Sequence, residues 1–356
     1  MRATFHGKKI SGILTVLPEH ECSFEDTIVA ENITRVRRLR RIMGFDKRRR
    51  VKRETCISDL HKYGLQYLIN QGLLEKDDIG AIVVVSLTPD YFAPSVSNIL
   101  QGALELGEEV VCVDIAQGCA GYIVGLFEAF SLLGHIEKNK KVVLCTGDIF
   151  NRETGEDIKT EEPQFGGDAA SISIIEDDAT FSNCYFNYYT DGKSGEELIM
   201  PAGAFKHPVY CEEDAYVELE DGRSGYGLGI WMDGSSVFNF ILKEVPPMLE
   251  DIFDYSKIKK EDVKYYFFHQ PNRYILEKLA DRIEVSRDKV PMDIVEQFGN
   301  SNSSTVPMAI VNGAAEKMIG NRYNCCLSGF GSGLTWASIL MELGDMDFCK
   351  QIISNI

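Results

Sequence analysis

One cysteine of this chain stands where an apolar strand is predicted to turn directly into an apolar helix. The stretch VDIAQGCAGYIVGL, residues 113–126, places Cys119 next to Gly118 and two residues before Gly121. The first amide groups of a helix lack internal partners, and the positive end of the helix dipole lies there, so we expect the pKa of this thiol to be lowered. The turn resembles a nucleophile elbow with sulfur as the nucleophile. A small buried cysteine at a helix start fits the same pattern.

Three other places along the chain carry groups that suit carbonyl chemistry. His269 follows the apolar run VKYYFF and precedes Pro271, which places an imidazole at the carboxyl end of a predicted strand, where ligands bind in α/β folds. Asn300 lies in FGNSNSSTVPMAI, and the glycine loop at 329–333 offers backbone N–H groups. The plainer interpretations are a satisfied core histidine, a helix cap by Asn300 or Asn302, and a tight hairpin. The combination favours a catalytic site.

The segments that must hold these residues alternate between β-branched runs and helical patterns. Such alternation predicts right-handed βαβ units around a largely parallel, buried sheet. In the first half the predicted strands are 81–88, 109–116, 140–148 and 169–176, with one helix from about Pro94 and another up to about His135. In the second half we predict a helix within 236–253, a strand at 263–270, helices from Pro271 and from about Asn302, and a strand region at 324–343.

A glycine-rich turn lies near the end of each half, FGGDAAS in the first and GFGSGLTWAS in the second. We therefore predict two halves of similar architecture, 1–178 with the cysteine and 179–356 with the histidine and asparagine. Residues from about 186 to 230 are rich in Gly, Asp, Glu and Tyr, which predicts an irregular insertion.

The composition is that of an ordinary globular protein, with 356 residues, 44% hydrophobic and 26% charged. The N-terminus lacks the apolar run of a signal peptide, and no stretch of about 18 apolar residues follows, so we expect a soluble, cytoplasmic protein without membrane association. The ten cysteines form no CxxC pair and no zinc-type spacing with histidine, which predicts free thiols and no metal site.

The net charge of −17 is unevenly distributed. Residues 35–53 hold eleven basic residues and one acidic residue, so this segment carries +10 and the remainder −27. A basic patch on an acidic protein is typical of a local polyanion site. Nucleic acid, a nucleotide-bearing substrate and an acidic carrier protein are all candidates, and a solvated charged helix fits equally.

The motifs together resemble those of β-ketoacyl-acyl-carrier-protein synthase III, in the thiolase-like superfamily of condensing enzymes. The resemblance lies in DIAQGCAGYIVGL around Cys119, HQPNRYILEKLA from His269, FGNSNSSTVPMAI around Asn300 and GFGSGLTWAS from Gly329. Weaker matches are IMGFDKRRR at 42–50, FGGDAA at 165–170 and MDGSSVFNF at 232–240. They cover most of the chain in the family's order.

The resemblance implies a five-layer αβαβα fold built from two thiolase-like halves, usually as a homodimer. It implies that Cys119 attacks an acyl thioester, carried by coenzyme A or acyl carrier protein. His269 and Asn300 would then donate hydrogen bonds to the thioester carbonyl of malonyl-carrier protein as CO2 leaves. The backbone N–H groups of Cys119 and Ser332 would form the oxyanion hole. No metal or cofactor is implied.

The chain departs from the family where coenzyme A or carrier protein binds. The places of the usual Trp and Arg fall on Arg38 and Ile42, and an expected Asn is Ser235. The residues that the resemblance assigns to this binding are Arg38, Arg41, Ser235, Phe238, Asn272 and Arg273. Ala93 takes the place of a large residue that often reaches the partner's acyl pocket, which indicates a roomier acyl site.

Several other functions share parts of this pattern. A thiolase would carry a second reactive cysteine where this chain has Phe330, so a decarboxylating synthase is favoured. An acyltransferase of the same fold would pass the acyl group from Cys119 to a hydroxyl or amine of a sugar or secondary metabolite, with His269 as general base. A non-catalytic acyl-binding partner has no chemical need for all three site residues. A role with nucleic acid lacks a recognisable binding motif.

Overall fold

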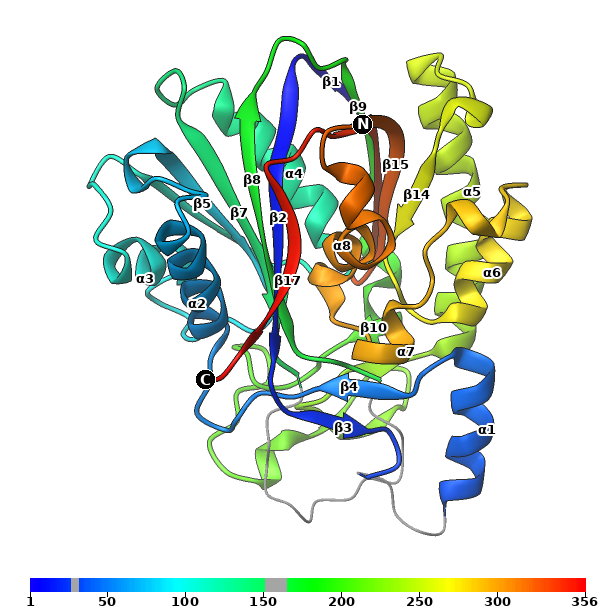
Figure 1. Cartoon of the computed structure of the whole chain (residues 1–356). Helices are drawn as coiled ribbons and strands as arrows, with labels where there is room; N and C mark the ends of the chain where they lie inside the picture. Colours follow the sequence, from blue (N-terminus) through cyan, green and yellow to red (C-terminus); the bar gives the residue numbers. More distant parts are fainter. Residues whose placement is uncertain (27–31, 151–164) are drawn as a thin grey trace.

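The computed structural model describes residues 1–26, 32–150 and 165–356, and most of them form two large β-sheets with helices between and outside them (Figure 1). The first sheet has six strands in the order β17-β2-β8-β7-β5-β6. Its strands are β2 (Lys8–Pro18), β5 (Ile79–Val85), β6 (Val111–Ile115), β7 (Lys141–Asp148), β8 (Ala169–Asp177) and β17 (Phe348–Ser354). β5 is parallel to β6 and β7, and all seven of its residues, IGAIVVV, are buried, as expected of a parallel strand covered on both faces.

The second large sheet has five strands in the order β1-β9-β16-β15-β14. They are β1 (Arg2–Phe5), β9 (Cys184–Thr190), β14 (Tyr265–Phe268), β15 (Arg322–Gly331) and β16 (Thr335–Gly344). Only β14 and β15 run parallel, and the other neighbours are antiparallel. β15 and β16 form one long hairpin, whose turn is the glycine loop.

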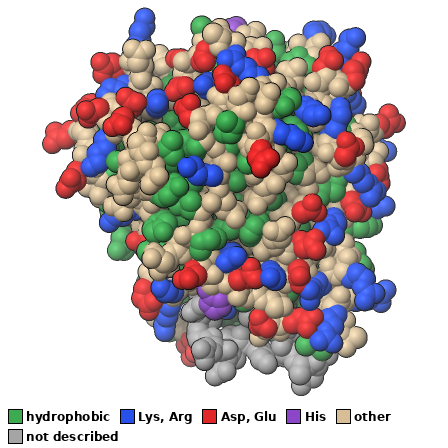
Figure 2. Space-filling view, in the orientation of Figure 1, with side chains coloured by type: hydrophobic (Ala, Val, Ile, Leu, Met, Phe, Trp, Pro, Cys, Tyr) green, Lys and Arg blue, Asp and Glu red, His purple; other side chains and the backbone are tan. Residues whose placement is uncertain are grey.

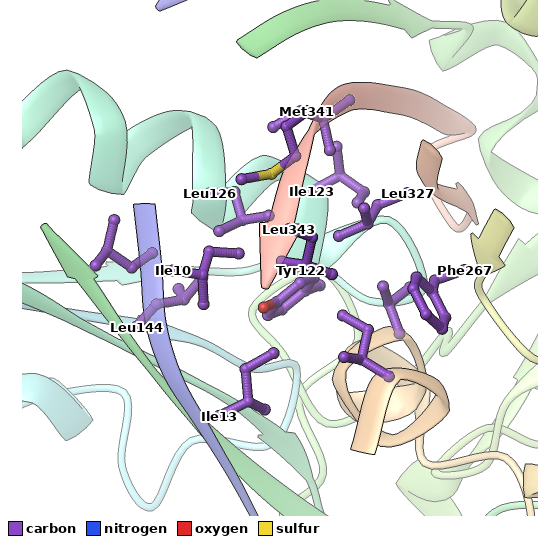
Figure 3. Close-up of a cluster of buried hydrophobic side chains, with 14 of the residues drawn as sticks. Ile10, Ile13, Tyr122, Ile123, Leu126, Leu144, Phe267, Leu327, Met341 and Leu343 are labelled. Carbon is purple, nitrogen blue, oxygen red and sulfur yellow. The ribbon is translucent and has the colours of Figure 1, made fainter. Parts of the chain in front are cut away.

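Two helices fill the space between the sheets. α4 (Gly121–Leu133) packs against β5 and β7 on one side and β15 and β16 on the other, and α8 (Thr305–Met318) likewise contacts both sheets. Figure 3 shows this core, where side chains of α4 meet those of both sheets. The residues labelled there are Ile10, Ile13, Tyr122, Ile123, Leu126, Leu144, Phe267, Leu327, Met341 and Leu343. A helix enclosed on both sides must be apolar around most of its circumference, which GYIVGLFEAFSLL satisfies.

The outer faces of the two sheets are covered by separate helices. α2 (Ile57–Asn70) and α3 (Val96–Ala103) lie on the six-stranded sheet, and α5 (Gly234–Ser256) lies on the five-stranded sheet with α6 (Arg273–Arg282) packed against it (Figure 1). The layers are therefore helix, sheet, helix, sheet, helix. The predicted αβαβα fold is confirmed.

Each end of the chain contributes one strand to the sheet that is formed mainly by the other half of the chain. β1 pairs with β9 of the second sheet, and the C-terminal strand β17 pairs with β2 of the first. A division between residues 178 and 179 therefore leaves each large sheet with one strand from the other half. The assignment of two halves stays a prediction.

The segment predicted as an insertion begins with the last residues of β9. Beyond Thr190 it contains two small antiparallel pairs around the buried residues Ala202, Val217 and Leu219. The pairs are β10 (Leu198–Ile199) with β13 (Trp231–Met232), and β11 (Tyr216–Glu218) with β12 (Ser224–Tyr226).

The basic segment forms a helix and a short strand at one edge of the molecule. α1 (Ile33–Met43) contacts α6, and β4 (Lys47–Arg49) pairs with β3 (Glu21–Ser23) and contacts α7 (Ile294–Phe298). None of the helices in the part of the chain that is described has the length and apolar character needed to cross a bilayer.

α2 carries a histidine that is completely enclosed against the six-stranded sheet. His61 is 0% exposed, its Nε2–H donates to the backbone oxygen of Thr146 at 3.1 Å, and its Nδ1 has no partner in the described structure. Burial lowers the pKa of this imidazole from 6.5 to about 4. The folded chain therefore holds His61 neutral over a range in which the unfolded chain protonates it.

We expect the free energy of unfolding to fall as the pH drops from 6.5 towards 4, because in this window the unfolded state binds a proton that folded His61 does not. His61→Gln keeps an N–H donor and removes the titration. For each unit by which the pH falls in this window, the free energy of unfolding of the variant should decrease by about 1.4 kcal/mol less than that of the wild type. Urea titrations at several pH values measure both slopes, and equal slopes would contradict this assignment.

Candidate active site

Cys119 lies between the end of β6 and the first residue of α4, in the layer between the two sheets. The backbone N–H groups of Ser332 and of Cys119 itself are directed at its Sγ atom. Ser332 belongs to the turn of the β15–β16 hairpin, so the two donors come from opposite halves of the chain. The predicted oxyanion-hole groups are thus brought together at the sulfur.

The pKa of the thiol moves in the direction opposite to the sequence-based expectation. Burial raises the pKa of Cys119 to about 12, and the charge of Asp148 adds to the rise, while the two backbone N–H groups lower it. The expected lowering of this pKa was therefore wrong. The helix dipole acts with roughly half an elementary charge, which does not compensate for removing a thiolate from water between two sheets.

The hairpin turn approaches Cys119 so closely that only glycine fits at two positions. A Cβ atom on Gly331 would lie 2.5 Å from Cβ and 2.7 Å from Sγ of Cys119, and one on Gly329 would lie 2.7 Å from Cα of Ala120. These separations are well below van der Waals contact. The glycine loop is therefore both a tight hairpin and a source of backbone donors.

His269 follows the last residue of β14 and is 2% exposed. Its ring meets the ring of Phe330 edge-on, with centroids 5.8 Å apart, and its Nδ1 lies 2.8 Å from Oγ1 of Thr305. Burial lowers the pKa of this histidine to about 3, although the nearby backbone of Asn302 raises it. The imidazole is thus neutral at pH 7.

The hydroxyl of Thr305 sets which nitrogen of His269 carries the proton. Oγ1 of Thr305 donates its single hydrogen to the backbone oxygen of Asn302 at 2.9 Å, so in this arrangement it accepts from Nδ1–H of His269 and Nε2 carries no proton. The other tautomer, with the proton on Nε2, requires Thr305 to turn its hydrogen from Asn302 to Nδ1. In this tautomer Nε2–H is a neutral donor available to a substrate.

Asn300 lies in the loop between α7 and α8 and is partly exposed. Its Oδ1 accepts a hydrogen bond from the backbone N–H of Asn302 at 2.9 Å. No bond within the described residues engages its NH2 group, so this group remains free to donate. α8 has Ser304 at its N-cap position, so neither Asn300 nor Asn302 caps this helix.

Asn302 is the site residue whose contact with the thiol was not predicted. The thiol of Cys119 donates to Oδ1 of Asn302 at 3.1 Å, and Nδ2 of Asn302 donates to Asp148 at 2.8 Å. Asp148 is the last residue of β7 and was assigned only to a strand. Its position at the carboxyl end of a buried parallel strand is the sequence signal that identifies such residues.

Of the predicted binding arginines, Arg41 and Arg273 line a cleft between α1, α6 and α7, and Arg38 does not. The cleft measures about 430 Å³ and is lined by Arg37, Arg40, Arg41, Gly44, Phe45, Asp46, Arg273 and Glu296. Arg37 and Arg40 pair with Glu25, and Arg273 pairs with Glu296. Arg38 and Arg41 are exposed and form no ion pair within the described residues. In Figure 2 acidic and basic side chains accordingly intermix where Figure 1 places α1.

The other predicted binding residues lie in different parts of the structure. Asn272 caps α6 through Oδ1, which accepts from the backbone N–H of Ile275 at 2.9 Å. Phe238 stacks on Tyr274 with ring centroids 5.9 Å apart, and Ser235 is exposed in the first turn of α5. Ala93 lies on an exposed loop beside Phe92, which is 75% exposed.

Comparisons with known proteins give one consistent result. Residues 253–343 match the family described as 3-oxoacyl-[acyl-carrier-protein (ACP)] synthase III C terminal. A putative 3-oxoacyl-[acyl-carrier-protein] synthase 3 of Campylobacter jejuni is 31% identical over 99% of this chain and 98% of its own length. The β-ketoacyl-[acyl-carrier-protein] synthase III of Streptococcus uberis is 26% identical over 83% of this chain and 88% of its own.

Solved structures of similarly named proteins share the fold. A crystal structure of 3-oxoacyl-(acyl-carrier protein) synthase from Burkholderia xenovorans superposes with a TM-score of 0.88 at 25% identity, covering 99% of both chains. The synthase III of Pseudomonas aeruginosa superposes with a TM-score of 0.77 at 21% identity, covering 96% of this chain and 99% of that one.

Gly331→Ala places a methyl group against Cβ and Sγ of Cys119, so we expect at least a hundredfold slower modification of this thiol by thioesters. Gly102→Ala is the matched control, because nothing lies within 4 Å of the added Cβ. Intact-protein mass spectrometry after incubation with acyl-CoA measures the rate. Equal rates in the two variants would show that the hairpin does not constrain the cysteine.

Proposed function

The chain belongs to the 3-oxoacyl-acyl-carrier-protein synthase III family of condensing enzymes, and we propose that Cys119 carries the acyl group in this protein. The observation that supports this role is the pair of backbone N–H groups, of Cys119 and Ser332, directed at the sulfur of a half-buried cysteine. Two further neutral donors are assigned to the same site, Nε2–H of His269 in the tautomer protonated there and the NH2 group of Asn300. Neutral donors fixed in a water-poor site suit a reaction that places negative charge on oxygen.

The first step transfers an acyl group to the enzyme. Sγ of Cys119 bonds to the carbonyl carbon of an acyl thioester while its S–H bond breaks. The carbonyl oxygen becomes negative and is stabilised by the N–H groups of Cys119 and Ser332. The bond to the donor's sulfur then breaks, and the departing thiolate takes up the proton. The covalent acyl-cysteine divides one difficult step into two.

The second step generates the carbon nucleophile. The C–C bond to the carboxylate of a malonyl thioester breaks, CO2 leaves, and the electron pair becomes an enolate on the thioester oxygen. Asn300 and His269 donate hydrogen bonds to that oxygen. Each such donor contributes about 3 kcal/mol in comparable oxyanion sites.

The third step joins the two fragments. The malonyl-derived carbon attacks the acyl carbonyl, whose oxygen is again held by the N–H groups of Cys119 and Ser332. Sγ leaves as thiolate and regains a proton from solvent, and the product is a 3-oxoacyl thioester. In each step negative charge develops on a carbonyl oxygen that faces an assigned donor, and each sulfur that leaves as thiolate is then protonated.

The protonation state of His269 favours condensation over acyl transfer to a hydroxyl or amine. Such a transfer needs a general base whose pKa lies close to the working pH. A histidine whose pKa burial has lowered to about 3 is a weak base. It is suited to donating a hydrogen bond.

A second copy of the chain covers the free edge of β6 in the proposed assembly. β6 is an edge strand of the six-stranded sheet, and its apolar residue Val111 is 39% exposed. Tyr91 and Phe92, in the loop after β5, are also exposed. An unprotected apolar edge strand is a ready template for pairing with another chain, and Ala93 would then face the partner.

Coenzyme A phosphates or an acidic carrier protein bind at the cleft beside α1. Arg41 lines this cleft and forms no ion pair within the described residues. Arg38 is also exposed and lies one turn away on α1. Because the cleft is open to solvent, this interaction weakens as the salt concentration rises.

The two half-reactions should separate in two variants. Cys119→Ala loses acylation by acyl-CoA but keeps release of CO2 from malonyl-carrier protein, because decarboxylation needs no thiol. Asn300→Ala keeps acylation and loses CO2 release by about a hundredfold, since one enolate donor is removed. Intact mass and labelled CO2 measure the two steps.

A matched control for these variants is Asn312→Ala, which changes the same side chain on α8, where its NH2 group bonds to the backbone of Met308. It should leave both half-reactions intact. Acylation that survives in Cys119→Ala would refute the proposed nucleophile, and unchanged CO2 release in Asn300→Ala would refute the enolate donor.

Arg41→Glu should raise KM for malonyl-carrier protein about tenfold with little change in kcat, because the charge acts in docking and lies outside the reacting group. The control Arg53→Glu makes the same charge change at an exposed residue that does not line the cleft. Steady-state kinetics at low and high salt measure the effect. A similar rise in KM for both variants would show that only net charge matters.

A further inference from the structure

A continuous hydrogen-bond chain runs from the nucleophile into the six-stranded sheet. The thiol of Cys119 donates to Oδ1 of Asn302 at 3.1 Å, and Nδ2 of Asn302 donates to Oδ2 of Asp148 at 2.8 Å. Asp148 is 0% exposed. None of the steps proposed above uses Asn302 or Asp148.

The carboxylate of Asp148 is held by donors on both oxygens. Oδ1 accepts from the backbone N–H of Leu87 at 2.7 Å and from the hydroxyl of Ser86 at 3.2 Å. Oδ2 accepts from Nδ2 of Asn302 and from the hydroxyl of Ser303 at 3.0 Å. A buried carboxylate with this many donors has a fixed position.

This fixed carboxylate determines which way the Asn302 amide faces. An ionised carboxylate only accepts hydrogen bonds, so the NH2 group must point at Asp148 and the oxygen must point at Cys119. The backbone of Asn302 is also unusual, with φ at 53°, a left-handed conformation that asparagine tolerates better than most residues. Backbone and carboxylate together place the oxygen 3.1 Å from sulfur.

We propose that Asn302 and Asp148 are positioning residues that hold the resting nucleophile as a thiol, with its proton directed at the amide oxygen. The inference deepens the proposed function, since it assigns a resting state to the same cysteine. An amide oxygen facing sulfur favours S–H and disfavours S⁻. The pair therefore protects Cys119 from reagents that need the thiolate, and leaves the sulfur lone pairs facing the oxyanion-hole side.

Among the described residues, the charged and titratable groups that the thiol and this pair face come from separate elements. Asp148 comes from β7, and beyond the backbone of Asn302 lies the neutral ring of His269, which follows β14. Burial raises the pKa of Asp148 to about 6, so above pH 7 the carboxylate is ionised and locks the amide. The relevant window for a test is therefore pH 7–9.5.

Asp148→Asn removes the negative charge and keeps the shape of the side chain. Its amide can also accept from Asn302 or donate to it, so the Asn302 amide is free to turn its NH2 group towards sulfur. Both changes stabilise the thiolate. We expect alkylation of Cys119 by iodoacetamide at pH 8 to become about tenfold faster, equivalent to lowering its pKa by one unit.

The rate is measured on the Cys119 peptide by mass spectrometry across pH 7–9.5, because Cys56, Cys112, Cys211 and Cys349 are also partly or fully exposed. Asp90→Asn is the matched control. Its carboxylate bonds to Ser58 on α2 and should leave the rate unchanged. A rate in Asp148→Asn that equals or falls below that of the wild type would overturn the proposal.

A second variant keeps the test decisive if Asp148→Asn does not fold. Asn302→Gly tolerates the positive φ and removes the amide oxygen, so faster alkylation is again expected and an unchanged rate would refute the role of Asn302. Iodoacetamide requires no acyl donor or malonyl partner. A failure of this proposal is therefore distinguishable from a failure of the condensing reaction.

Discussion

The close approach of the β15–β16 hairpin to Cys119 is the constraint on which the site depends. A Cβ on Gly331 would lie 2.7 Å from the sulfur, so the N–H group of Ser332 reaches the sulfur only because that position lacks a side chain. The approach is possible because a single helical layer separates the sheets, and α4 begins directly beneath the hairpin turn. The two N–H groups at the sulfur therefore come from segments that follow strands of different sheets, and neither half of the chain contains both.

Burial has opposite consequences for the groups in this site. It lowers the pKa of His269 and raises those of Cys119 and Asp148, so that the imidazole and the thiol are both neutral in the resting protein. The buried carboxylate of Asp148, which is ionised above pH 7, has hydrogen-bond donors on both oxygens, so its charge is not left unpaired. In the proposed reaction, further negative charge develops on oxygens that face N–H donors and on the sulfur atoms that leave.

The sequence predicted the layers because their signals are local: alternation of apolar strands and helices located β5 to β8. The ordered motifs indicated Cys119, His269 and Asn300, whose catalytic roles stay predictions. The helix predicted from Pro271 begins instead at Arg273, because Asn272 caps it. The raised pKa of Cys119 and the bond from Asn302 to Asp148 were not predictable, since they join residues 154 positions apart and depend on desolvation in the folded core. Ion pairs such as Glu25 with Arg37 likewise neutralise much of a segment that the sequence presents as strongly basic.

The most direct test of the account follows the acyl group through the wild-type enzyme. Intact-protein mass spectrometry would record Cys119 after incubation with a panel of acyl-CoAs, and then after addition of malonyl-carrier protein. The account predicts an adduct on Cys119 that malonyl-carrier protein discharges, with one CO2 released for each 3-oxoacyl thioester formed. An adduct that persists after this addition would contradict condensation, and the absence of an adduct from every donor would contradict the nucleophilic role of Cys119.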